Sequence, residues 1–192
     1  MAPFNNKTRQ IDDDLDDPCE LARRYEYGDG VDRDEEKAFK LYLEAAEDGY
    51  IPAMHEVAQC YERGSGVDRD EEKAFKWYLE AAEDGYIPAK HEVAQCYERG
   101  DGVDRDEEKA FKWYLKAAEN GYIPSFCEVA QCYEYGDGVD RDEEKAFKWY
   151  LKAAESYDVA AISEVAERYE TGNGVQKNME QASEWRRIER LN

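Results

Sequence analysis

The sequence predicts an all-α protein, a solenoid of about five stacked helix pairs. Three observations lead to this fold class. The chain repeats at an interval of 36 residues, and residues 61–96 and 97–132 differ at only six positions. Each copy holds two segments in which apolar residues recur at helical spacing. The second segment is apolar on two sides, so it needs a neighbouring copy to bury both of them.

The first helix of a copy is illustrated by residues 53–64. Its apolar residues fall at positions i, i+3, i+4 and i+7, and they are Met54, Val57, Ala58 and Tyr61. Gly64 then provides the left-handed conformation that commonly ends a helix. One apolar face, followed by a glycine, is therefore expected for the first helix of each copy.

The second helix falls within residues 68–85. Asp70 is suited to cap its N-terminus, and Glu71 and Glu72 complement the positive end of the helix dipole. We expect one apolar face with Ala74, Trp77, Tyr78 and Ala81, and another with Phe75, Leu79 and Ala82. Gly85 is expected to close the helix.

The repeat also sets the domain organisation. Residues 1–15 are predicted to be a disordered polar tail, and residues 16–192 to form the repeat array. Its units begin near residues 17, 53, 89, 125 and 160, and the last helix acts as a cap. Residues 156–161 lack the glycine and the proline of the other junctions, which predicts a locally altered bend there.

The residues shared by the copies form a recognisable motif. In one copy it consists of Tyr97, Gly100, Gly102, Val103, Asp106, Lys109, Ala110, Trp113, Tyr114, Lys116, Ala117, Ala118, Glu119 and Gly121. The motif resembles the Sel1-like repeat, a relative of the tetratricopeptide repeat, over about residues 18–191. The resemblance implies a right-handed α/α superhelix whose concave surface, lined by the first helices, binds proteins. It also implies a scaffold or adaptor role.

Composition limits the classes of partner. The net charge of −21 disfavours nucleic acid and anionic membrane surfaces, and it suits a basic protein. No apolar stretch is long enough to span a membrane, and the N-terminus lacks the apolar core of a signal peptide. We therefore expect a monomer in the cytoplasm, without nucleic-acid partner or membrane insertion. Delivery as a secreted effector stays open.

No catalytic, cofactor or metal site is expected. The two histidines belong to a column of equivalent positions that reads Cys19, His55, His91, Cys127 and Ser163. Members of such a column lie one repeat step apart, too far to share a zinc ion. The five cysteines are expected to be buried free thiols, because equivalent cysteines are too far apart for a disulfide. An enzyme is therefore not predicted.

The positions that vary between copies provide the candidate binding surface. On the first helices, a stripe beside the buried one changes from copy to copy, while the packing residues stay constant. Tyr and Arg, which are common interface anchors, occur in it. The predicted partner-binding residues are Arg23, Tyr27, His55, Gln59, Arg63, His91, Gln95, Arg99, Phe126, Gln131 and Tyr135. Drift at unconstrained positions is the alternative explanation for the same variation.

These observations favour a non-enzymatic scaffold that binds a protein or peptide on the surface of the first helices. Two alternatives stay open at this point. The acidic charge also suits an inhibitor or immunity-type protein, or a nucleic-acid mimic, that blocks a basic partner. The near-identity of the copies also suits a consensus-engineered scaffold with no natural partner.

Overall fold

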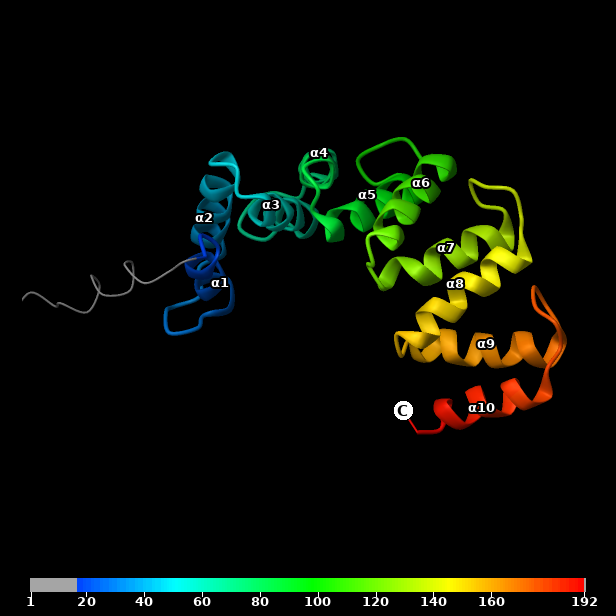
Figure 1. The fold of residues 1–192 in the computed structure, drawn as a ribbon. Helices are drawn as coiled ribbons and strands as arrows, with labels where there is room; N and C mark the ends of the chain where they lie inside the picture. The colour runs from blue at the N-terminus through cyan, green and yellow to red at the C-terminus, as the bar shows by residue number, and fades with distance from the viewer. Residues whose placement is uncertain (1–16, 192) are drawn as a thin grey trace, which may run out of the picture. The chain divides into compact units, whose positions relative to one another are not determined.

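The computed structural model describes residues 17–191, which contain ten α-helices and no strand (Figure 1). The predicted all-α class is confirmed. The predicted tail, residues 1–15, lies outside the described residues. Within the described range, none of the helices has both the length and the apolar character that crossing a membrane requires.

Contacts divide the chain into two units, the first ending at Tyr86 and the second beginning at Ile87. The first contains α1 (Glu20–Tyr27), α2 (Glu35–Glu47), α3 (Ile51–Arg63) and α4 (Glu71–Glu83). The second contains α5 (Ile87–Arg99), α6 (Glu107–Glu119), α7 (Pro124–Tyr135), α8 (Glu143–Glu155), α9 (Val159–Thr171) and α10 (Met179–Glu189). Within each unit every helix packs against the next one in sequence, as α7 to α10 show in Figure 1. A single array over residues 16–192 stays a prediction.

The odd-numbered helices are the first helices of the copies and are called helices A; the even-numbered ones are helices B. Helix α3 ends as predicted at Gly64, which has a left-handed φ of 72°. It begins at Ile51, two residues before the predicted start, with Pro52 in its first turn. The Asp70 carboxylate caps α4 by accepting a hydrogen bond from the backbone N–H of Lys73 at 3.0 Å. These local signals therefore determine the helix ends.

Both predicted faces of helix B are used for packing. In α4, the buried side chains come from each face and are Ala74, Phe75, Tyr78, Ala81 and Ala82. The buried tyrosine of each complete helix B donates a hydrogen bond from its hydroxyl to a glutamate of the preceding helix A. These pairs are Tyr42–Glu26, Tyr78–Glu62, Tyr114–Glu98 and Tyr150–Glu134, at 2.8–3.0 Å. Each helix pair thus satisfies its buried phenol internally.

The second glycine of the loop after a helix A lies against the preceding copy in three of the loops, at Gly66, Gly138 and Gly174. A Cβ atom built at Gly138 would lie 2.0 Å from the backbone oxygen of Glu107, at the start of α6. Gly66 has the same relation to Glu35 in the first unit. A side chain at either position would collide with backbone, so only glycine fits.

The junction at residues 156–161 keeps its turn without the usual glycine. Tyr157 takes a φ of 65°, which lies in the same left-handed region as the φ of 85° at Gly121, one period earlier. The backbone N–H of Asp158 donates to the oxygen of Ala153 at 3.1 Å, matching the bond from Tyr122 to Ala117 at 3.0 Å. The hydrogen bonds of the turn are therefore retained, and the altered bend stays a prediction.

The prediction of free thiols is confirmed, because all five cysteines are free. Four of them are buried, and Cys127 is half-buried.

Candidate partner-binding surface

The structure exposes four of the predicted binding residues in equivalent places. Tyr27 and Arg63 are the last residues of α1 and α3 in the first unit, and Arg99 and Tyr135 are the last residues of α5 and α7 in the second. Each is followed by a glycine of positive φ that turns the chain away from the helix. Tyr27 is 72% exposed and Tyr135 is 69% exposed. We call these four residues the helix-end row.

His55 and His91 do not belong to an accessible surface, which corrects the sequence-based prediction. Only 8% of His55 and 6% of His91 are exposed. The His91 ring lies against the rings of Tyr114 and Tyr122, with centroids 5.3 and 5.5 Å away. Aromatic side chains of the neighbouring helix and turn therefore cover these histidines, which spacing along helix A alone did not reveal.

Burial also determines the charge of the histidines. It lowers the pKa of His55 and of His91 to about 4, with a smaller contribution from a nearby arginine in each case. Nδ1 of His91 forms a hydrogen bond with Ser125 Oγ at 2.9 Å, and its Nε2 forms one with Gln95 at 3.1 Å. The ring nitrogens of His55 have no such partner among the described residues. Both imidazoles are neutral at pH 7.

The remaining predicted residues lie beside the row or between helices. Arg23 is half-buried and forms an ion pair with Asp17 at 2.8 Å. Phe126 is half-buried, and its ring packs against Trp149 at 5.7 Å between centroids. Gln131 is exposed, whereas Gln59 and Gln95 are half-buried. Phe126 therefore has a packing role, and Gln131 is the one exposed glutamine of the three.

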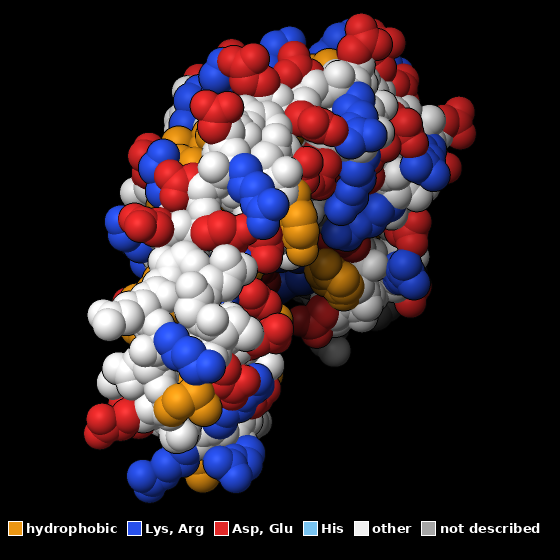
Figure 2. Space-filling view, turned by 90° about the vertical axis from the view of Figure 1, so that its right-hand side faces the viewer, with side chains coloured by type: hydrophobic (Ala, Val, Ile, Leu, Met, Phe, Trp, Pro, Cys, Tyr) orange, Lys and Arg blue, Asp and Glu red, His pale blue; other side chains and the backbone are white. Residues whose placement is uncertain are grey.

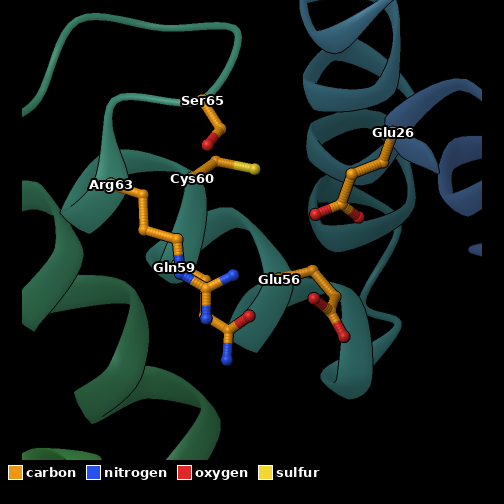
Figure 3. A pocket seen from close by; sticks show the side chains of 6 residues that line it. All are labelled: Glu26, Glu56, Gln59, Cys60, Arg63 and Ser65. Atoms are coloured by element: carbon orange, nitrogen blue, oxygen red, sulfur yellow. The ribbon is translucent and has the colours of Figure 1, made fainter. Parts of the chain in front are cut away.

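A group of carboxylates next to the row was missed by the sequence reasoning. In the first unit, Glu26 of α1 and Glu56 of α3 lie around Cys60, with Gln59, Arg63 and Ser65 on the other side (Figure 3). Burial raises the pKa of Glu56, and the charge of Glu26 raises it further. Burial, together with these two carboxylates and Glu35, raises the pKa of Cys60 to about 12. We call the glutamates around Cys60 the first acidic pocket.

The same arrangement recurs 72 residues later in the second unit. A cavity of about 40 Å³ is lined by Glu98, Arg105, Glu107, Ala110, Cys132 and Asp137. Burial raises the pKa of Glu128, and the carboxylate of Glu98 adds to that effect. Burial, followed by nearby carboxylates, raises the pKa of Cys132 to about 12. The glutamates around Cys132 are the second acidic pocket.

A third copy of this arrangement contains an arginine in place of the cysteine. Arg168 of α9 stands 36 residues after Cys132 and is only 1% exposed. Its Nη2, Nη1 and Nε donate to Glu134, Glu143 and Glu164 at 2.6, 3.1 and 2.8 Å. Its guanidinium also lies 4.8 Å from the centroid of the Tyr150 ring. The sequence signal that would have located it is the column Arg24, Cys60, Cys96, Cys132, Arg168.

These features suit recognition better than covalent chemistry. A raised thiol pKa keeps Cys60 and Cys132 protonated at pH 7, and the thiol is a poor nucleophile compared with the thiolate. No group of His, Cys, Asp and Glu side chains within the described range is arranged to hold a metal ion. Exposed aromatic and cationic side chains, together with half-buried carboxylates such as Glu56 and Glu128, are instead suited to contact a peptide or protein.

Successive helix pairs joined by turns that recur from copy to copy define a helical-repeat protein. Five copies of the Sel1 repeat match the chain, at residues 19–50, 51–86, 87–122, 127–158 and 159–185. The chain belongs to the Sel1 repeat family. Sel1 repeats generally serve as protein-interaction scaffolds without enzymatic activity. Among proteins with curated descriptions, none matches the chain.

Solved structures show the same fold. One is c5321, a protective antigen present in uropathogenic Escherichia coli strains that displays an SLR fold; it is 33% identical with a TM-score of 0.88. The match covers 91% of this chain and 37% of that one, so this chain spans little more than a third of that protein. A Sel1 repeat protein from Oxalobacter formigenes is 29% identical with a TM-score of 0.85, over 91% and 72% of the two chains.

A more distant similarity concerns the fold alone. The immunity protein Pa5087 from Pseudomonas aeruginosa is 20% identical, with a TM-score of 0.57, and the match covers 98% of this chain and 67% of that one.

Proposed function

We propose that the chain is a non-enzymatic interaction module that binds a protein or peptide partner through the surface formed by its helices A. The observation that carries this proposal is the helix-end row. Tyr27 and Tyr135 are large, aromatic and mostly exposed, and each is the last residue of a helix A. An exposed tyrosine contributes a large contact area at a low cost in side-chain entropy.

The row varies while its supports do not. The same position is tyrosine in α1 and α7 and arginine in α3 and α5. Each of these residues ends a helix A, is followed by a glycine of positive φ, and precedes a helix B that an aspartate caps. A rigid support of this kind lowers the ordering cost of binding, and it leaves the choice of partner to the variable side chains.

A variant with Tyr27→Ala, Arg63→Ala, Arg99→Ala and Tyr135→Ala tests the proposal. Its matched control carries Lys40→Ala, Lys76→Ala, Lys112→Ala and Lys148→Ala, four exposed lysines at equivalent places on helices B. Proteins captured from lysate by the wild type are measured against both variants. We expect the control to bind like the wild type, and the row variant to bind at least about tenfold more weakly, since truncating one anchor often costs about 2 kcal/mol. Equal binding by both variants would place the interaction on another surface.

An acidic inhibitor that blocks a basic partner is the second candidate, favoured by the net charge of −21. On the face drawn in Figure 2, however, Lys and Arg side chains lie among the Asp and Glu side chains. Ion pairs such as Lys76–Glu72 at 2.6 Å offset part of the acidic charge locally. Binding that weakens steeply with salt, and that the row variant keeps, would favour this candidate over a scaffold.

A partnerless, consensus-engineered scaffold is the third possibility. Failure to capture any protein at low and moderate salt would favour it.

A further inference from the structure

The chain contains an internal template for the use of its acidic pockets. Arg168 shows how the fold holds a guanidinium among three glutamates, Glu134, Glu143 and Glu164. Glu98, Glu107 and Glu128 stand 36 residues before Glu134, Glu143 and Glu164, and Glu26, Glu35 and Glu56 stand 108 residues before them. At the place of Arg168 itself, the two pockets have Cys132 and Cys60. The chain therefore supplies its own cation at Arg168 and a thiol at Cys60 and Cys132.

The template extends to individual oxygen atoms of the first glutamate. Glu134 accepts the Tyr150 hydroxyl on Oε2 at 2.8 Å and Arg168 on Oε1 at 2.6 Å. Glu98 accepts the Tyr114 hydroxyl on Oε2 at 3.0 Å, so its Oε1 corresponds to the oxygen that binds Arg168.

The second and third glutamates correspond in the same way. Oε1 of Glu143 is paired with Arg141, and its Oε2 accepts Arg168 at 3.1 Å. Oε1 of Glu107 is likewise paired with Arg105, at 2.6 Å. Glu128 corresponds to Glu164, which accepts from Nε of Arg168. Each pocket thus has glutamates at the three positions that bind one guanidinium in the third copy.

The geometry selects among cations. The three glutamates come from three different helices, and each receives a different nitrogen of Arg168. A planar guanidinium offers donors in such a fork, whereas a lysine ammonium is a compact point charge. In the described part of the chain these carboxylates do not form a group able to hold a metal ion. An arginine side chain is therefore the ligand that fits.

The second pocket contains free space beside its carboxylates. Its cavity of about 40 Å³ is large enough for roughly three waters, at 10–15 Å³ for each. In the first pocket, Arg63 of the helix-end row lies beside the carboxylates (Figure 3). The first pocket consequently lies next to a residue of the surface that is proposed to bind a partner.

We propose that the two acidic pockets, one in each unit, each bind an arginine side chain of the protein partner. This inference rests on the proposed function and deepens it, because it names the chemistry of the partner: a segment with arginines. The net charge of −21 attracts such a segment over a distance, and the pocket then fixes its side chain in a defined place.

The test titrates the ¹⁵N-labelled full chain with the peptide acetyl-Gly-Arg-Gly-amide and follows the backbone amide signals. The same peptide with lysine or with neutral citrulline is the ligand control. We expect the arginine peptide to shift the amides near Cys60 and Cys132, with a dissociation constant on the order of 1 mM, as a few charged hydrogen bonds without other contacts would give. The citrulline peptide should bind at least about tenfold more weakly.

Two variants fill one pocket each and serve as controls for one another. Cys132→Arg places the side chain of the template in the second pocket, so the shifts there should disappear while those near Cys60 remain. Cys60→Arg should give the reverse. Should either arginine variant fail to fold, Glu128→Gln removes one carboxylate instead and should weaken binding at the second pocket only.

Equal binding of the citrulline peptide would overturn the inference. Shifts near Cys132 that survive in Cys132→Arg, or no shifts at about 10 mM peptide, would overturn it as well. The proposed function is tested separately by Tyr27→Ala and Tyr135→Ala, which leave the carboxylates intact. A partner lost from these two variants, together with an arginine peptide that fails to bind, would mean that the helix-end row binds and the pockets do not.

Discussion

Replacing Arg168 by cysteine converts the third copy into the sequence that the second acidic pocket already has. The substitution removes three hydrogen bonds to carboxylates and the contact with the Tyr150 ring. It leaves Glu134, Glu143 and Glu164 facing one another without the cation. We expect the protein to fold and to be markedly less stable.

The magnitude follows from how buried the partners are. Removing one member of a fully buried ion pair costs about 3–5 kcal/mol. Arg168 is 1% exposed, but the side chains of Glu134, Glu143 and Glu164 are 17%, 23% and 34% exposed, so water can compensate them in part. The lower end of the range, about 3 kcal/mol, is therefore expected, which for a chain of this size lowers the melting temperature by roughly 6–12 °C.

Thermal unfolding followed by circular dichroism at pH 7 measures the effect. Arg187→Cys, which changes an exposed arginine of α10 to the same residue, is the matched control and should melt like the wild type. Arg168→Lys keeps the charge but loses the fork, so it should lie between wild type and Arg168→Cys. A melting temperature of Arg168→Cys within about 1 °C of the wild type would refute the assignment of net stability to this cluster.

Acid should reduce the difference between Arg168→Cys and the wild type. Burial alone would raise the pKa of Glu143, but hydrogen bonds from Arg141 and Arg168 lower it below the ordinary 4.5. A carboxylate with a lowered pKa stabilises the fold above pH 4.5, and this contribution is lost as the pH falls through the folded-state pKa. A gap that widens below pH 4.5 would contradict this explanation.

Three further predictions concern turns and buried histidines. Gly138→Ala should lower the melting temperature far more than Gly121→Ala, because both sites have positive φ but only the Cβ at 138 would meet backbone, at 2.0 Å. Tyr157→Gly should raise stability in urea by about 1 kcal/mol, since it relieves a left-handed tyrosine that is 75% exposed. Stability should fall as the pH drops from 6.5 towards 4, because the folded-state pKa of His55 and His91 is about 4. His91→Gln should make that dependence shallower.

Each of these has a clear contrary result. Equal losses at positions 138 and 121 would mean that the loop does not pack against α6 as described. A less stable Tyr157→Gly would indicate that the tyrosine side chain makes contacts worth more than its backbone strain. An unchanged pH profile in His91→Gln would show that this imidazole is not buried in its neutral form.

The sequence was sufficient for features that depend on neighbours along the chain. Asp70 caps α4 and Gly64 ends α3, because a cap and a left-handed residue act within a few positions. The two apolar faces of helix B followed from spacing alone. Caps, terminating glycines and apolar faces recur in the copies, so a helix boundary predicted correctly in one copy was also correct in the others.

Features that depend on the neighbouring helix were not predictable in this way. Spacing on helix A placed His55 and His91 beside the buried stripe, but their burial depends on the rings of Tyr78 and Tyr114 that lean over them. The acidic pockets were missed for the same reason. Glu26 and Glu56 lie on different helices, and only the fold places both beside Cys60.

The distribution of arginine and cysteine in this column indicates why the inner copies differ from the outer ones. In α1 and α9, the arginine donates from Nε to the glutamate four residues earlier, Arg24 to Glu20 at 3.2 Å and Arg168 to Glu164 at 2.8 Å. Cysteine stands at this position in the helices between. An arginine at this position is compatible with the fold, as Arg168 shows, so Cys60 and Cys132 leave their neighbouring glutamates without the guanidinium that Arg168 supplies in the third copy. Proteins keep such costly local arrangements mainly at functional sites, which is the argument for an arginine that arrives from outside.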